Sequence, residues 1–214
     1  MKVLTLGCSF TYGEELSRVD NAWPYLLART NNWTLTNLAK SGASNDRNIR
    51  LLFNELPNQY DLIIFAWTNP DRFEVPYNDR IIDICVNHDL VTQLPWVLEY
   101  YANHSERFYN YEKWIRTVVM LQSHLEAIKQ PYLFVSTFGI QADLNQDYYN
   151  EYMPKLKYLT DQVNDKFYID WPNLGMLDWQ GNCPLGPGGH PLEIGHQRIA
   201  EHINEHIRNI SGLS

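Results

Sequence analysis

The sequence has few cysteines, a deficit of basic residues and no long apolar run, and each shortage excludes a class of protein. Its three cysteines, Cys8, Cys85 and Cys183, are odd in number and form no CxxC pair. A complete disulfide framework is therefore excluded, which favours a reducing compartment. The 17 lysines and arginines are outnumbered by 25 acidic residues, for a net charge of −8. This balance argues against nonspecific binding to nucleic acid or to an anionic membrane.

No stretch of the sequence is suited to crossing or entering a membrane. The longest apolar runs, such as Leu62 to Trp67, are far shorter than the roughly 18 residues that a span requires. Met1 to Gly7 is too short for the apolar region of a secretory signal. We therefore expect a cytoplasmic protein. Its 214 residues, 44% hydrophobic and 20% charged, are typical of a single globular domain.

Strand-like and helix-like segments alternate along the chain, which predicts an α/β fold with a mostly parallel sheet. The strongest strand pattern is Asp61 to Thr68, which is apolar on both faces, as in the centre of a parallel sheet covered by helices. Five strands are predicted in all, over residues 2–7, 33–38, 61–68, 132–137 and 167–170. Helices are predicted at about 24–28, 45–56, 106–129, 145–163 and 191–209.

The pattern loosens from about residue 70 to 105, which we interpret as an insertion containing one β-like stretch, Arg80 to Val86. Aromatic residues make up 14% of the chain, and several lie in or beside this segment. Most aromatics fill cores, but those from Phe73 to Tyr111 would overhang the strand ends and offer a stacking surface for a flat substrate such as a sugar.

In a parallel sheet the active site lies beyond the carboxyl ends of the strands. Ser9 follows the first strand on a tight turn, where its hydroxyl can attack a carbonyl and its N–H can bind the resulting oxyanion. Gly42 follows the second strand and can offer a backbone N–H, and Asn69 follows the third and can offer a side-chain amide. His190, just before the last predicted helix, would be the base.

Each of these residues also has an ordinary structural interpretation. Ser9 can be a turn former or a helix cap, Gly42 a residue at positive φ, and Asn69 the start of an Asx turn before Pro70. His190 can be a loop histidine. Four weak signals at the four expected places carry more weight together than separately.

The four motifs resemble those of the SGNH hydrolases, also called GDSL esterases or lipases. That family is named for a Ser, a Gly, an Asn and a His in separate motifs that follow one another in this order. Gly7-Cys8-Ser9-Phe10-Thr11 is similar to its first motif, and Asn37-Leu38-Ala39-Lys40-Ser41-Gly42 to its second. Trp67-Thr68-Asn69-Pro70 is similar to the third, and Pro187-Gly188-Gly189-His190-Pro191 to the last.

The resemblance implies a three-layer, flavodoxin-like α/β/α sandwich and one SGNH-hydrolase-like domain over residues 1–214, with the insertion at about 70–105. It implies a serine esterase acting on a small-molecule or carbohydrate ester, without a metal or organic cofactor. Ser9 would be the nucleophile and His190 the general base, while Gly42, Asn69 and the Ser9 N–H would form the oxyanion hole. It also favours a phage or bacterial origin, and it leaves the oligomeric state open.

The sequence departs from the family pattern at three positions. Cys8 stands where the family has Asp beside the nucleophile, and Trp67 where it has Gly. Pro187 stands where the family has the acid three residues before His190. A carboxylate there would hold the imidazole in its productive tautomer. Either a Ser-His dyad works without it or another acid replaces it, and Asp178 is the nearest candidate, although it can also be a solvated loop carboxylate.

The missing acid and the thiol of Cys8 each leave one rival function open. One is a noncatalytic binding or structural protein that keeps the fold, and the other is a thiol-dependent acyl transferase that uses Cys8. Beside Asn69, Asp71 and Arg72 can form a local ion pair, which we favour, or place a guanidinium at the site for an anionic substrate. His196, inside the last predicted helix, is expected to cap or pack.

Overall fold

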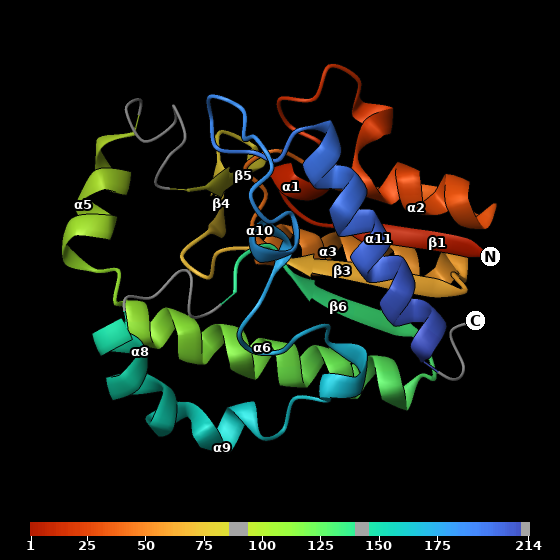
Figure 1. Ribbon diagram of the computed structural model, residues 1–214. Helices are drawn as coiled ribbons and strands as arrows, with labels where there is room; N and C mark the ends of the chain where they lie inside the picture. Colours follow the sequence, from red (N-terminus) through yellow and green to blue (C-terminus); the bar gives the residue numbers. More distant parts are fainter. Residues whose placement is uncertain (86–93, 140–145, 211–214) are drawn as a thin grey trace.

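A computed structural model of the protein describes residues 1–85, 94–139 and 146–210. Its core is a sheet of four parallel strands in the order β2-β1-β3-β6 (Figure 1). Every residue of β3 is buried, because this strand lies between β1 and β6 with helices on both of its faces. The predicted central strand is therefore confirmed. The strands are β1 (Lys2–Leu6), β2 (Thr34–Asn37), β3 (Leu62–Trp67) and β6 (Tyr132–Ser136).

The prediction of a fifth strand, over Phe167 to Asp170, is wrong. Among the described residues of this segment, Tyr168 forms an isolated parallel bridge with Phe134 and no longer ladder. Asp165–Phe167 form a 3-10 turn just before it, and Asp170 adopts a left-handed φ of 53° just after it. An extended stretch confined between two turns cannot continue a ladder, so pairing at this edge of the sheet stops at one bridge.

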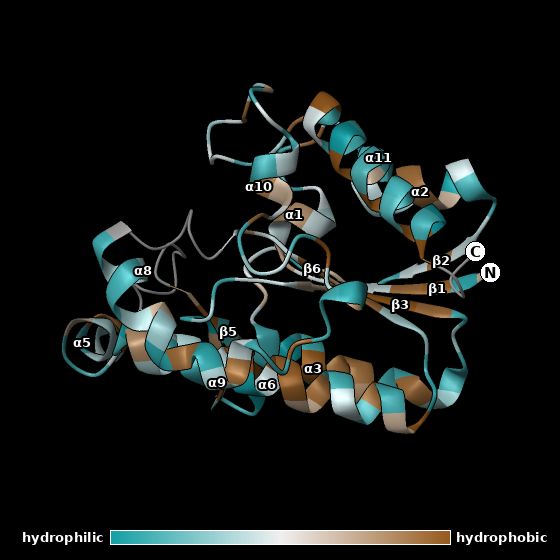
Figure 2. Ribbon diagram, turned by 60° about the horizontal axis from the view of Figure 1, so that its bottom comes forward, coloured by the Kyte–Doolittle hydropathy of each residue, from teal (hydrophilic) through white to brown (hydrophobic). Residues whose placement is uncertain are grey.

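Helices cover both faces of the sheet and make three layers, as predicted (Figure 2). Alternate strand residues point to opposite faces, so that Ile63 and Phe65 pack toward one helical layer and Leu62 and Ile64 toward the other. The first layer contains α3 (Asn45–Glu55), α6 (Arg107–Ala127) and α9 (Lys157–Thr160). The second contains α2 (Trp23–Asn31), α10 (Met176–Trp179) and α11 (Glu193–Asn209).

The predicted helix over residues 145–163 is interrupted. It consists of α8 (Gln146–Tyr152), a 3-10 turn over Met153–Leu156, and α9. Pro154 lies in that turn, and proline has no backbone N–H with which to continue an α-helix. None of the described helices is long and apolar enough to cross a membrane.

The segment from 70 to 105 contains an antiparallel hairpin and a helix packed against it. The hairpin pairs β4 (Phe73–Tyr77) with β5 (Arg80–Ile84), and α5 (Pro95–Asn103) follows. Ile84, Leu94 and Val97 form a small core of their own. The sequence pattern suggested one β-like stretch here, and β5 covers most of it. Part of that stretch, Val86, lies outside the described residues.

The carboxyl ends of β1, β3 and β6 open toward one end of the sheet (Figure 1). The short helix α1 (Ser9–Tyr12), the β4–β5 hairpin and the segment that precedes α11 gather at that end. Met1 and the C-terminal end of α11 lie at the opposite end. All four motifs of the sequence lie in segments that follow strands or precede α11, so the topology brings them to one end of the fold.

Candidate active site

A cleft of about 460 Å³ opens at this end of the sheet. Three of the residues predicted for the site, Ser9, Gly42 and His190, line it together. Its size falls within the range of small-molecule sites. The described residues that line it are Ser9, Phe10, Ser41, Gly42, Arg72, Cys85, Phe138, Leu177, Leu185, Gly188, Gly189 and His190.

Ser9 is the first residue of α1 and is 5% exposed. Cys8 is the N-cap residue, and its carbonyl accepts hydrogen bonds from the N–H groups of Thr11 and Tyr12. The N–H of Ser9 comes before the first intrahelical bond, so it has no acceptor within the helix. Ser9 therefore carries its hydroxyl at a helix start, with a backbone N–H that no intrahelical bond uses.

His190 is held by a carboxylate that the sequence analysis did not identify, that of Glu15. The His190 Nδ1 and Glu15 Oε2 atoms are 2.8 Å apart, and the two side chains are only 20% and 19% exposed. Glu15 also accepts the backbone N–H groups of Gly188, at 2.7 Å, and of His190, at 3.2 Å. The Gly188 N–H bond, followed by the contacts with His190, lowers the pKa of Glu15 below its usual value. Glu15 is therefore ionised at neutral pH and can accept a hydrogen bond from the Nδ1–H group of His190.

The glycine-rich loop before His190 is shaped around the Glu15 carboxylate. A Cβ atom on Gly186 would lie 2.6 Å from the Glu15 Cδ, and one on Gly188 would lie 3.0 Å from its Oε2. Any larger residue at position 186 would therefore push the Glu15 carboxylate away from Gly188 and His190. The signal for Glu15 in the sequence was weak, because an acid 175 residues before its histidine partner follows no motif spacing.

Asp178, the acid that we predicted, lies elsewhere. Its Oδ2 accepts the backbone N–H of Gly175 at 2.8 Å, which caps the start of α10. Its carboxylate is thus used within its own turn, and it is absent from the described residues that line the cleft. The carboxylate that contacts the His190 ring is that of Glu15, so the assignment of Asp178 as partner of His190 is corrected.

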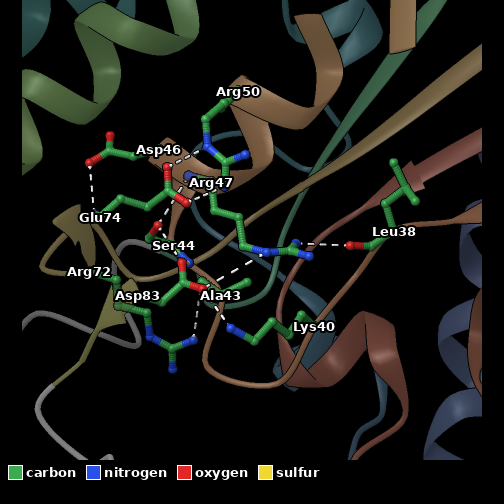
Figure 3. Close-up of polar contacts among 10 residues, drawn as sticks. All are labelled: Leu38, Lys40, Ala43, Ser44, Asp46, Arg47, Arg50, Arg72, Glu74 and Asp83. Atoms are coloured by element: carbon green, nitrogen blue, oxygen red, sulfur yellow. Dashed lines mark hydrogen bonds and ion pairs between the residues drawn. The ribbon is translucent and has the colours of Figure 1, made fainter. Parts of the chain in front are cut away.

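The loop that carries Gly42 is fixed by a carboxylate from the β4–β5 hairpin (Figure 3). Asp83 on β5 is 8% exposed, and its Oδ1 accepts both the N–H and the hydroxyl of Ser44 at 2.8 Å. Its Oδ2 lies 3.1 Å from the Lys40 Nζ and 3.9 Å from the Arg47 Nε. Gly42 itself has a φ of 72°, a conformation that glycine adopts without strain. Residues on both sides of Gly42 are therefore tied to the hairpin.

Asn69 lies at the end of β3 beside the cleft, not among the described residues that line it. Its Oδ1 accepts the N–H of Asp71 at 2.8 Å. This hydrogen bond forms the Asx turn that its position before Pro70 suggested. Thr68, the residue before Asn69, is held by Asn45 at the start of α3. The Asn45 side chain donates to the Thr68 carbonyl at 3.0 Å and accepts the Thr68 N–H at 2.9 Å. The helix that begins after Ser44 is thus joined to the β3 end.

Cys8 faces away from the cleft. Its thiol is fully buried and lies 3.5 Å from the Thr137 hydroxyl. Burial raises the pKa of this thiol, but the charge of Arg72 and the hydrogen bond with Thr137 outweigh burial and leave the pKa lowered. Because a buried atom cannot meet a substrate without a rearrangement, this position disfavours Cys8 as a nucleophile.

Among the described residues that line the cleft, no aromatic side chain comes from the insertion. Phe73 packs against Tyr100 and Tyr101, with ring centroids 4.9 and 6.1 Å apart. The two rings that line the cleft, Phe10 and Phe138, come from α1 and from the segment after β6. Phe10 also packs edge-on against the His190 ring, with centroids 5.6 Å apart.

His196 packs in the interior, as expected for a residue inside the final helix. It is fully buried, and its Nδ1 accepts the backbone N–H of Trp23 at 3.2 Å. Burial lowers the pKa of His196 to about 4, so the ring is neutral at physiological pH. No group of three or more His, Cys, Asp and Glu side chains suited to a metal ion occurs in the described part of the chain.

Comparison with solved structures shows that this fold is shared with lipolytic proteins and esterases. A member of the lipolytic G-D-S-L family from Veillonella parvula superposes with a TM-score of 0.51 and 14% identity, over 98% of this chain and 100% of that one. The psychrotrophic esterase EstA from Pseudoalteromonas sp. superposes with a TM-score of 0.54 and 13% identity, over 97% of this chain and 96% of that one.

A carbohydrate esterase of family two from Clostridium thermocellum, in complex with cellohexaose, is similar in the same way. Its TM-score is 0.53 at 13% identity, and the match covers 100% of this chain and 65% of that one. In sequence, no family model and no curated protein matches. The comparisons therefore show that the chain has the fold of the SGNH hydrolases.

Proposed function

We propose that this chain, which has the fold of the SGNH hydrolases, is a serine esterase that cleaves small-molecule or carbohydrate-linked esters. The observation that carries the proposal is the contact between Glu15 and His190 at the wall of the cleft that Ser9 also lines. A carboxylate on the imidazole of a histidine that shares a cleft with a serine is the arrangement that activates a hydroxyl for acyl transfer.

The tautomer of His190 follows from its contact with Glu15. Because an ionised carboxylate only accepts hydrogen bonds, the His190 proton lies on Nδ1 and the lone pair on Nε2. Nε2 then takes the proton of the Ser9 hydroxyl as Oγ attacks the ester carbon. It returns that proton to the departing alcohol, which leaves an acyl group on Ser9.

Water releases the acyl group in the second half of the reaction. His190 Nε2 takes a proton from the water, whose oxygen attacks the acyl carbon, and the Ser9 oxygen leaves with that proton. The products are a carboxylic acid and a regenerated Ser9. In both halves the N–H groups of Ser9 and Gly42 and the amide of Asn69 are assigned to the developing oxyanion. One such donor is typically worth roughly 2.7–4 kcal/mol of barrier.

The noncatalytic alternative was motivated by the absent acid at Pro187. Glu15 removes that reason, because it supplies a carboxylate to the same ring nitrogen from a different segment of the chain. The thiol-dependent alternative is weakened by the complete burial of Cys8.

Hydrolysis of p-nitrophenyl acetate by four proteins tests the proposal. The wild-type chain and Cys8→Ala should turn over, whereas Ser9→Ala and His190→Ala should lose most of the activity. Circular dichroism spectra serve as the folding control. An inert wild type, or full activity in Ser9→Ala, contradicts the mechanism, and loss of activity only in Cys8→Ala would favour the thiol-dependent reaction.

A further inference from the structure

Arg72 is the one permanently charged side chain among the described residues that line the cleft. It lies between the end of β3 and the first residue of β4, and it is partly buried. His190, the other ionisable base of the lining, is matched by the Glu15 carboxylate. The cleft wall therefore carries one positive charge that the proposed acyl-transfer mechanism does not use.

The neighbouring cations are paired with carboxylates. Lys40 and Arg47 contact Asp83, and Arg50 contacts Glu74. Within the parts of the chain that the structure describes, Arg72 takes part in none of the ion pairs. Its Nη1 donates instead to the Ala43 carbonyl at 3.4 Å (Figure 3).

The backbone that carries Arg72 is also held in place. The backbone N–H of Arg72 donates to the Asn69 carbonyl at 3.3 Å, and the following hairpin is fixed to the Gly42 loop through Asp83. The positive charge of Arg72 acts on Cys8, the residue before Ser9, because it contributes to lowering the pKa of the Cys8 thiol. A partly buried guanidinium offers five N–H donors in a planar fork and is suited to a planar anion.

We propose that Arg72 binds a carboxylate of the substrate, so that the preferred esters carry an acidic group close to the scissile bond. This inference rests on the proposed esterase function and adds its substrate class. One guanidinium balances one negative charge, which fits a carboxylate better than a phosphate dianion. Because the chain carries a net charge of −8, long-range attraction does not favour an acidic ester, and a local cation is needed to hold it.

Two matched pairs of probes test the proposal. The first pair, 4-acetoxybenzoate and 4-acetoxybenzamide, places the acid or its neutral amide on the leaving alcohol. The second pair, the mono-4-nitrophenyl ester of succinate and that of succinamate, places it on the acyl group. Arg72→Gln should lower kcat/KM for the acidic member of at least one pair roughly tenfold to a hundredfold more than for its neutral partner. Arg72→Lys should keep part of that preference.

The ratio between acidic and neutral probes separates this role from two others. If Arg72 stabilises the oxyanion, or only supports the Ala43 carbonyl, Arg72→Gln lowers kcat/KM for both members of each pair equally, and the proposal is overturned. Arg116→Gln on α6 removes the same charge from an exposed i,i+4 pair outside the cleft and should leave the ratio unchanged. A change of the ratio in Arg116→Gln would mean that net charge, and not a site, sets the preference.

Binding to an inactive variant distinguishes failure of this inference from failure of the esterase function. In equilibrium dialysis, Ser9→Ala should bind 4-acetoxybenzoate more tightly than 4-acetoxybenzamide, and Ser9→Ala/Arg72→Gln should bind both alike. If wild type hydrolyses none of the four probes but this difference persists, the esterase proposal fails and the carboxylate site stands. If the double variant keeps the preference for the acidic probe, Arg72 is not its site.

Discussion

Glu15 is the residue on which the account of the site depends most. Its carboxylate joins the loop after α1 to the loop before α11 through three hydrogen bonds, to the Gly188 N–H, the His190 N–H and the His190 ring. Glu15 itself adopts a left-handed φ of 66°, which ordinary residues seldom occupy. A residue held in such a conformation by several contacts is typical of a functional position.

Replacing Glu15 by Gln tests this assignment at one atom. The variant keeps the size of the side chain but loses its negative charge. Without an anionic acceptor for the Nδ1–H hydrogen bond, the imidazole is no longer held in that tautomer. We expect kcat for p-nitrophenyl acetate to fall roughly 10²- to 10⁴-fold with little change in KM. Glu14→Gln, the same change one residue earlier, is the matched control and should leave kcat unchanged. A larger loss in Asp178→Asn than in Glu15→Gln would restore the acid that we have discarded.

Gly186→Ala tests the position of the Glu15 carboxylate without changing its charge. The added methyl group would lie 2.6 Å from the Glu15 Cδ, so the carboxylate must move away from His190. We expect a lower kcat in this variant and a folded protein, because a side-chain end can move more easily than backbone. Steady-state kinetics and thermal unfolding measured together check this. Wild-type kcat in Gly186→Ala would show that the position of the carboxylate does not matter.

Among the elements of the fold, the β4–β5 hairpin supports one side of the site. The hairpin acts through Asp83 on the Gly42 loop, and Arg50 on α3 adds a bidentate pair with Glu74 on β4, at 3.0 and 2.6 Å. The segment that the sequence presented as an insertion thus supports the loop assigned to the oxyanion hole, a role that no periodicity could predict.

Asp83→Asn should loosen the Gly42 loop. The amide keeps one acceptor for Ser44 but loses the charge that faces Lys40 and Arg47, of which Arg47 is only 17% exposed. We expect the free energy of unfolding to fall by about 1–3 kcal/mol and kcat for neutral esters to fall roughly tenfold. Asp20→Asn, which breaks the exposed pair with Arg18, should change neither quantity. Equal kcat values in Asp83→Asn and wild type would show that the contact between the hairpin and the Gly42 loop does not contribute to catalysis.

His196 should make the α2–α11 junction sensitive to acid. Burial lowers its pKa to about 4 in the folded protein, against about 6.5 when unfolded, with Glu193 opposing and His190 reinforcing the shift. Between these values the unfolded chain binds more protons, so stability falls as the pH drops through this window. We expect a loss of about 2 kcal/mol in unfolding free energy from pH 7 to pH 4.5 through this group.

Denaturant unfolding of wild type and His196→Asn at both pH values measures this contribution. The asparagine Oδ1 can still accept the Trp23 N–H, but it has no proton to gain. The variant should therefore lose less stability between pH 7 and pH 4.5 than wild type. The same loss in both proteins would assign the acid sensitivity to other groups.

For the molecule as a whole, the sequence predicted the three layers and three of the residues that line the cleft. It did not predict the contacts that join segments distant in the chain. A continuous apolar run identified β3 and a period-3.6 pattern identified α11, because β3 buries both of its faces and α11 buries one. Ser9, Gly42 and His190 were found because they lie next to strand ends or a helix start. Glu15 and Asp83 act across 175 and 39 residues, on partners that only the folded chain reveals.

Mapping a covalent fluorophosphonate adduct by mass spectrometry tests the central claim most directly, since it needs no knowledge of the substrate. The account predicts a single adduct on Ser9 in wild type and in Cys8→Ala, none in Ser9→Ala, and slower labelling in Glu15→Gln. Fluorophosphonate reacts fastest with a hydroxyl that a neighbouring base activates, so the rate of labelling at Ser9 reports the Glu15–His190–Ser9 arrangement. An adduct on Cys8, or no adduct on a folded wild-type protein, would contradict it.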